Sequence, residues 1–137
     1  MQETLNNSVL FRIARTSNRL NQTINALLNE NGIAPEQRIL LEILTSCEQP
    51  NQTTLATILN KSPTTISRTL DSLEKKALIV KKEVLGDKRA KRIEVTSEGI
   101  AILERTKETV EAFRQSLSNM FTPEEKQTLF TLLEKLS

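Results

Sequence analysis

Apolar positions recur at helical spacing along most of the chain, and this pattern predicts long helices at both ends. Residues 3–30 have apolar side chains at near-helical spacing, with polar residues between them, and stop at Asn31-Gly32, a pair typical of helix ends. A second helix is predicted from Pro35 to Cys47, since proline suits a first helical turn. Further helices are predicted from Thr96 or Ser97 to about Met120, and after Thr122-Pro123-Glu124-Glu125, which matches a capping box.

The middle of the chain has a different pattern. Asn51 is placed to cap a short helix through Leu59, and Asn60-Lys61 is a tight turn before a helix from Ser62-Pro63 to about Lys76. Two runs rich in β-branched residues follow, at 78–84 and 90–95, around a charged segment at 85–89. The order helix, turn, helix, hairpin predicts a helix-turn-helix whose second helix docks in the major groove of DNA.

Composition narrows the fold class. Aromatic residues are 3% of the chain, with four Phe and no Trp or Tyr, so the core must consist mostly of Leu, Ile, Val and Ala. We therefore predict a mainly α fold with a small β-hairpin. Residues 35–96 would form a winged helix-turn-helix DNA-binding region, and residues 1–34 and 97–137 a helical dimerisation region. The reason for the second assignment is that the terminal helices have more apolar residues than one small lobe can bury.

The predicted helix at 62–76 has an apolar side, formed by Ile66, Leu70, Leu73 and Ala77, which should face inward. Its N-terminal turn and opposite side supply the candidate DNA contacts, namely Pro63, Thr64, Thr65, Ser67, Arg68 and Lys75. Small hydroxyl side chains let the helix approach base edges closely, and an arginine reaches a phosphate or a guanine. The alternative interpretation is an ordinary amphipathic helix with a solvated face.

Charge is concentrated around the predicted hairpin. Residues 60–96 include ten basic and five acidic side chains, a net +5 against +2 for the whole chain. The candidate DNA-binding residues here are Lys81, Lys82, Asp87, Lys88 and Arg89. An arginine at a protruding tip can enter a narrow minor groove, and Asp87 is expected to orient Arg89. A solubilising turn with a weak surface ion pair is the alternative.

The segments LATILNKSPTTISRTLDSLEKKALIVKK, GDKRAKRIEVTSEG and TPEEKQTLFTLLEKL follow one another in an order and spacing that resemble the MarR family. The similarity runs from about Ile33 to Leu136. It implies a winged helix-turn-helix transcriptional regulator that binds double-stranded DNA as a homodimer, on a palindromic operator, with repression relieved by a small ligand. The chain departs from the usual pattern at Ala77, where Gly is common, at Lys81 and Lys82, where Arg is usual, and at Ala34, which replaces a capping Thr.

The same resemblance implies a small organic effector bound between the dimer arms and the winged lobe. For such a pocket we name Phe11, Arg12, Arg15 and Arg38.

Other classes of function are disfavoured. The chain has no His, no Gly-rich phosphate loop and no nucleophile elbow, so we expect neither an enzyme nor a His-based metal site, and no cofactor. The single Cys47 is expected to be buried and inert rather than a redox sensor. A cytoplasmic location without membrane contact is expected, since no signal peptide and no apolar run of roughly 18–20 residues is present.

One alternative predicts the same fold, namely a winged-helix module that binds another protein. The basic hairpin favours DNA instead, because a protein-binding wing has no need of such a charge. Binding to duplex DNA that weakens with salt would distinguish the two.

Overall fold

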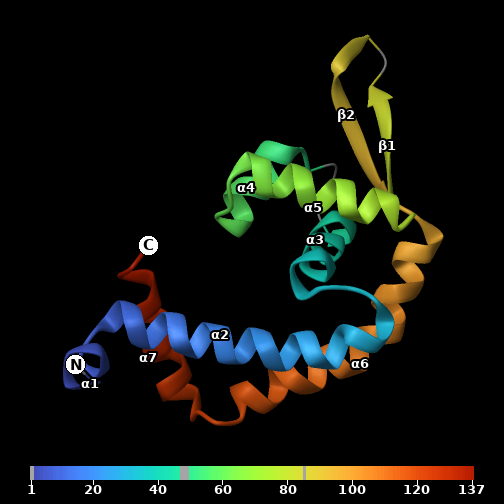
Figure 1. Ribbon diagram of the computed structural model, residues 1–137. Helices are drawn as coiled ribbons and strands as arrows, with labels where there is room; N and C mark the ends of the chain where they lie inside the picture. The colour runs from blue at the N-terminus through green and yellow to red at the C-terminus, as the bar shows by residue number, and fades with distance from the viewer. Residues whose placement is uncertain (1, 47–49, 85) are drawn as a thin grey trace. The chain divides into compact units, whose positions relative to one another are not determined.

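The computed structural model describes residues 2–46, 50–84 and 86–137, with the side chains of all of these except Gln2 and residues 87–91. The helices are α1 (Gln2–Asn6), α2 (Val9–Leu28), α3 (Pro35–Ser46), α4 (Gln52–Leu59), α5 (Pro63–Lys75), α6 (Ser97–Ser118) and α7 (Pro123–Glu134), with a 3₁₀ turn η1 (Asn29–Asn31). The strands are β1 (Ile79–Val84) and β2 (Asp87–Val95). The predicted fold class, mainly α with one hairpin, is confirmed (Figure 1). Cys47, predicted to end the second helix, lies outside the described residues.

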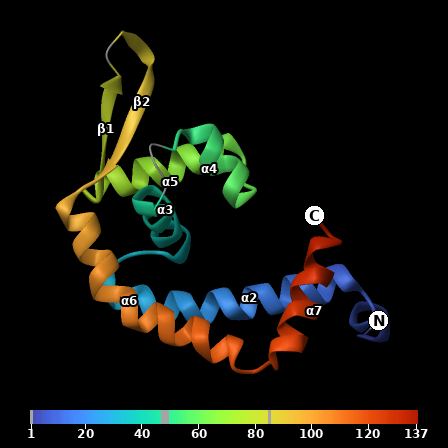
Figure 2. The same ribbon diagram turned by 180° about the vertical axis from the view of Figure 1, so that it is seen from behind.

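The chain divides into two compact units, Met1–Thr106 and Lys107–Ser137. In the first unit, α3, α4 and α5 gather into a cluster from which the hairpin projects (Figures 1 and 2). Its interior is aliphatic, as composition predicted. The fully buried side chains include Leu28, Leu40, Leu41, Leu55, Ile66, Leu70, Leu73 and Ile79.

The prediction of one continuous helix over residues 3–30 is wrong, because the chain breaks between α1 and α2. Ser8 is extended, with φ −85° and ψ 119°, and its hydroxyl accepts a hydrogen bond from the Phe11 N–H at 3.1 Å. A serine in this conformation caps a new helix, in competition with the continuation of the preceding one. The predicted stop after α2 is confirmed, since Gly32 has the left-handed φ of 66°.

The hairpin is regular at its base and irregular near its tip. The two strands pair antiparallel from Ile79 opposite Val95 to Glu83 opposite Lys91, and the register then shifts so that Val84 pairs with Asp87. The shift places residues 88–90 of β2 outside the regular ladder, as in a bulge. The predicted tip at 85–89 is therefore too long, because β2 already begins at Asp87.

A short segment after β2 joins the hairpin to α6. Of the two predicted starting residues of this helix, Thr96 and Ser97, it is Thr96 that caps α6, because its Oγ1 accepts a hydrogen bond from the Gly99 N–H at 3.1 Å. The same hydroxyl donates to the Ala77 carbonyl oxygen at 2.7 Å, and the Thr96 N–H donates to the Leu78 carbonyl oxygen at 3.0 Å. These bonds attach the base of the hairpin to the first turn of α6.

The second unit contains the end of α6 and the whole of α7. The predicted capping box is confirmed: the Glu125 N–H donates to Thr122 Oγ1 at 3.1 Å, and the Thr122 N–H donates to Glu125 Oε1 at 2.9 Å. Several large apolar side chains of this unit are exposed, namely Met120, Phe121, Phe130, Leu132, Leu133 and Leu136. In neither unit does a described helix have the length and apolar character needed to cross a membrane.

Candidate nucleic-acid interface

The polar turn between α4 and α5 sets where α5 begins. Asn60 takes the left-handed conformation with φ 52°, which asparagine tolerates better than most residues. Ser62 is extended, and its Oγ accepts a hydrogen bond from the Thr65 N–H at 3.1 Å. Pro63 then occupies the first turn, where its missing N–H costs nothing. The predicted helix-turn-helix boundary is confirmed by these residues.

The inward side of α5 is formed by Ile66, Leu70 and Leu73, which are buried as predicted. Ala77, placed on the same stripe by the sequence pattern, is instead exposed. The reason is that α5 ends at Lys75, so that helical periodicity no longer applies to Ala77. Leu78 and Ile79 fill the corresponding part of the interior.

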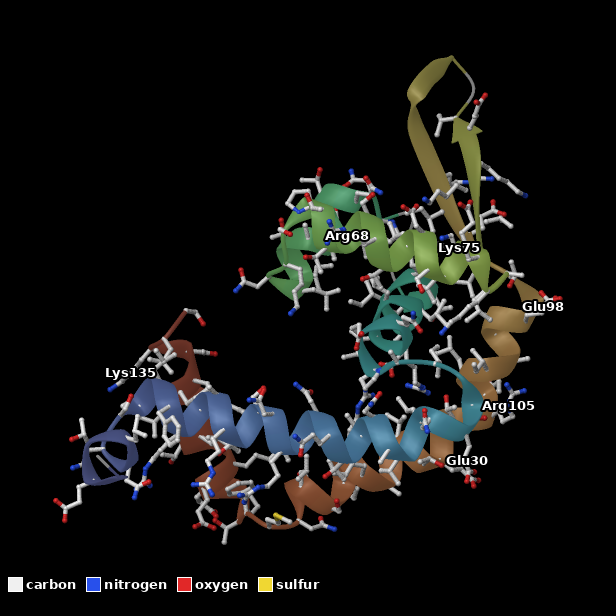
Figure 3. All side chains as sticks on the ribbon, viewed as in Figure 1. Glu30, Arg68, Lys75, Glu98, Arg105 and Lys135 are labelled. Carbon is white, nitrogen blue, oxygen red and sulfur yellow. The ribbon has the colours of Figure 1, made fainter. Side chains whose placement is uncertain are left out.

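The outward side of α5 brings several predicted residues onto one surface. Thr64 and Arg68 are exposed opposite the buried stripe, and Ser67 is half-buried beside them. Lys75 is exposed two helical turns after Arg68, at the end of α5 beside the hairpin (Figure 3). Small hydroxyls and cations are the kinds of side chain with which proteins contact bases and phosphates, and this surface has both.

The other two α5 candidates lie at the start of the helix. Pro63 is exposed in the first turn. Thr65 lies on a different flank of α5 from Thr64, where its side chain lines a cleft shared with α2 and α3. Its Oγ1 accepts a hydrogen bond from Ser62 Oγ at 2.9 Å. A DNA contact by Thr65 stays a prediction.

The two lysines at the hairpin base, Lys81 and Lys82, are paired with carboxylates. Lys81 Nζ lies 2.6 Å from Asp71 Oδ1 and 3.8 Å from Glu74 Oε1, both on α5. Lys82 Nζ lies 2.9 Å from Glu94 Oε2, within the hairpin. At the tip, the backbone of Asp87, Lys88 and Arg89 is in β2, and their side chains lie outside the described part of the chain.

Glu94 is an acidic residue that lies between two cationic side chains of the hairpin. Besides the contact with Lys82, its Oε1 accepts a hydrogen bond from Arg92 Nη2 at 2.7 Å. The hydrogen bond from Lys82, with a further contribution from Arg92, lowers the pKa of Glu94 below its ordinary value. The sequence analysis did not identify Glu94, because the residues around a single acid in a basic strand do not show which cations it contacts.

Gln37 of α3 is a second residue that the sequence did not identify. It is 8% exposed, its Nε2 donates to Ser72 Oγ at 2.8 Å, and its Oε1 accepts from Lys76 Nζ at 2.9 Å. Lys76 Nζ also donates to the Gly32 carbonyl oxygen at 2.8 Å. These bonds fasten α5 to α3 and to the turn after α2, and they join residues far apart in sequence.

The four residues named for an effector pocket do not come together. Phe11 and Arg15 line a shallow hollow of about 370 Å³ on α2, and Arg12 donates a hydrogen bond to the Asn6 carbonyl oxygen. Arg38 is buried, with Nε donating to Thr106 Oγ1 at 2.6 Å and Nη2 donating to the Leu103 carbonyl oxygen at 3.1 Å. Arg38 thus joins α3 to α6.

A larger cleft of about 800 Å³ lies elsewhere in the first unit, between α2, α3 and the α4–α5 turn. The amides Asn18, Asn21, Gln22 and Asn25 form its α2 wall, while Ile39 and Leu40 contribute apolar area from α3. No sequence pattern indicated this cleft, because amides on the polar face of a helix look the same as a solvated surface. No cluster of three His, Cys, Asp or Glu side chains suited to a metal ion occurs among the described residues.

The chain is similar to known proteins both in sequence and in fold. Residues 33–91 match the sequence model of the MarR family. Uncharacterised HTH-type transcriptional regulators of Bacillus thuringiensis subsp. konkukian and Bacillus anthracis are 33% identical over 136 residues, covering 97% of this chain and 89% of theirs. Among solved structures, S. aureus MepR in a DNA complex superimposes with a TM-score of 0.87 at 26% identity, over 94% of this chain and 96% of that one. A MarR/EmrR family regulator from Acinetobacter sp. ADP1 gives a TM-score of 0.81 at 27% identity, over 91% and 89%.

Proposed function

Because the chain belongs to the MarR family, we propose that it is a sequence-specific DNA-binding transcriptional regulator that acts as a homodimer on a palindromic operator. The names of the Bacillus relatives and the DNA complex of S. aureus MepR support this proposal. It includes a cytoplasmic location, where such a regulator would meet its operator.

The observation that supports DNA binding best is the exposed surface of α5 beside the hairpin. Thr64, Ser67 and Arg68 point away from the core on a helix whose opposite side is fully buried. In this arrangement α5 enters the major groove, and the hairpin tip with Arg89 enters the adjacent minor groove. The backbone N–H of Thr64 at the start of α5 would donate a hydrogen bond to a phosphate, whereas Pro63 has no N–H and the Thr65 N–H already donates to Ser62 Oγ.

The proposal also assigns repression and its relief by a small organic effector. The 800 Å³ cleft supports the second part, since its volume lies in the range of small-molecule sites and polar and apolar side chains both line it. An effector there would contact α2 and the start of α5 together, because Asn21 and Thr65 both line it. Its binding would then change the position of α5 relative to α2.

The first experiment is to select DNA fragments from the source genome on the purified protein and to sequence those retained. Recovery of a common palindromic site, with affinity that falls steeply as salt rises, is expected. If no fragment is enriched and binding to duplex DNA is insensitive to salt, the protein-binding winged helix becomes the better assignment.

A substitution of Arg68 tests the α5 surface directly. On the selected operator, Arg68→Ala is expected to relax the base preference at one position of each half-site, with a loss of about 1–3 kcal/mol if Arg68 contacts a base. Lys107→Ala, which removes one positive charge from the exposed part of α6, is the control and should keep the base preference. An unchanged preference in Arg68→Ala would remove Arg68 from the base-contacting residues.

A further inference from the structure

The ammonium group of Lys81 is held between α5 and the hairpin. The Lys81 side chain is 15% exposed, although it starts from a strand of a projecting hairpin. Its Nζ donates to Asp71 Oδ1 at 2.6 Å and lies 3.8 Å from Glu74 Oε1. Asp71 and Glu74 are three residues apart on α5 and therefore neighbours on its surface. The three side chains form an ionic cluster that joins two different elements.

Lys82, the next residue, has a different environment. Its side chain is 58% exposed, and its partner Glu94 belongs to the same hairpin. Successive strand residues point to opposite faces, which explains why adjacent lysines meet different carboxylates. The pair of Lys82 with Glu94 lies within the hairpin, whereas the Lys81 cluster connects the hairpin to α5.

From these contacts we propose that Lys81, Asp71 and Glu74 are positioning residues that fix the hairpin relative to α5, and that Lys81 is not a phosphate ligand. The proposal goes beyond the proposed function, because the cluster would exist without DNA. It rests on that function only for its effect on operator binding.

The cluster has a physical role in groove binding. A two-stranded hairpin is marginally stable by itself, and its orientation depends on contacts at its base. Simultaneous entry of α5 and the hairpin into neighbouring grooves requires a fixed separation between them. If the contacts at Lys81 set that separation before DNA arrives, less conformational freedom is lost on binding.

The first test uses spin labels and no DNA. The labels are attached through Lys61→Cys and Val84→Cys, at two exposed positions, in a chain with Cys47→Ser, and the labelled chain is mixed with a large excess of unlabelled chain. The distance distribution between the labels is compared in the parent, Lys81→Met and Lys82→Met. We expect Lys81→Met to broaden it and Lys82→Met, the matched control, to leave it unchanged. Equal distributions in all three proteins would overturn the proposal, whether or not the protein binds DNA.

The second test measures operator affinity against salt. Because Lys81 is a positioning residue, Lys81→Met should weaken operator binding by about threefold to fivefold without altering the dependence of affinity on salt. A phosphate ligand would instead flatten the slope by about 0.9 for each phosphate that the protein no longer neutralises. A flattened slope in Lys81→Met would therefore show that Lys81 contacts DNA.

The direction in which Asp71→Asn changes operator affinity distinguishes a positioning role of Asp71 from mere proximity to DNA. If Asp71 only stood near DNA, its neutralisation would reduce repulsion of phosphate and tighten binding. As a member of the cluster, Asp71→Asn should weaken binding by about threefold, and the double variant Asp71→Asn with Lys81→Met should be no weaker than Lys81→Met alone. Exchange of the charges, Asp71→Lys with Lys81→Asp, should make the distribution of distances between the labels narrower than it is in Lys81→Met. Tighter binding by Asp71→Asn, or additive losses in the double variant, would contradict the proposal.

Discussion

Ala77 adopts a left-handed backbone conformation, with φ of 60°, between the end of α5 and the start of β1. A Cβ atom makes this conformation unfavourable by roughly 1–2 kcal/mol, and glycine avoids that cost at some expense in conformational entropy. We expect Ala77→Gly to raise the free energy of unfolding by about 0.5–1 kcal/mol in urea denaturation.

Ala101→Gly is the matched control, because Ala101 is exposed inside α6, where glycine is unfavourable. That variant should lose about 1 kcal/mol. Destabilisation by both substitutions would mean that Ala77 is not strained in the folded protein.

Gly99 lies where the chain has no room for a side chain. A Cβ atom added there would be 2.4 Å from the Leu78 carbonyl oxygen and 2.6 Å from Val95 Cγ1. Both neighbours belong to the packed base of the hairpin, so Gly99→Ala should lower the free energy of unfolding by about 1–3 kcal/mol. Glu104→Ala, at an exposed position of the same helix, should stay within about 0.5 kcal/mol of the parent in the same denaturation series.

At the scale of elements, the hairpin includes a titratable carboxyl group, that of Glu94, which is paired with cations of the same hairpin. The pKa of Glu94 is lowered by the hydrogen bond from Lys82 and by Arg92, so the folded protein favours the ionised carboxylate. Its stabilising effect is therefore complete above the ordinary carboxyl pKa of about 4.5 and is lost as pH falls through the lower folded value. We expect the carboxyl carbon of Glu94, followed by NMR, to titrate with a midpoint below 4.5.

Lys82→Met should move that midpoint upward, because it removes the largest cause of the shift. A Glu94 midpoint at or above its ordinary value in the parent would show that the contacts with Lys82 and Arg92 do not persist in solution.

The helices that the sequence predicted well begin at capping residues, which can be recognised from the few residues that follow them. The side chains of Asn51, Ser62 and Thr122 each cap a helix by accepting a hydrogen bond from the backbone N–H three residues later. Ser8 does the same, but the apolar spacing stays in phase across it, so periodicity hid the break. The pairing of Lys81 with Asp71 has no local signal, because ten residues separate them along the chain and only the packing of the hairpin on α5 brings them together.

At the scale of the whole molecule, the exposed apolar residues near the ends of the chain support a dimer. Leu10 of α2 is 79% exposed and Leu132 of α7 is 51% exposed. Large exposed apolar side chains of this kind normally mark an interface when they gather in a patch. Leu10→Asp and Leu132→Asp should each shift the mass measured by light scattering from dimer towards monomer, because each buries a charge in the proposed interface.

The control for this prediction is Thr53→Asp, which adds the same charge to an exposed position on α4. It should leave the mass unchanged. A parent protein that is already monomeric at micromolar concentration would contradict the dimer, and an unchanged mass in both leucine variants would place the interface elsewhere.

The register shift between Glu83 and Val84 separates a paired base from the tip of the hairpin. The base ladder, from Ile79 opposite Val95 to Glu83 opposite Lys91, is complete before the shift begins. A change in the length of the segment between Glu83 and Lys91 therefore need not alter how the base packs. We therefore expect this part of the chain to be exchangeable: segments of other lengths and charges grafted between these two residues should leave the pairing at the base of the hairpin unchanged.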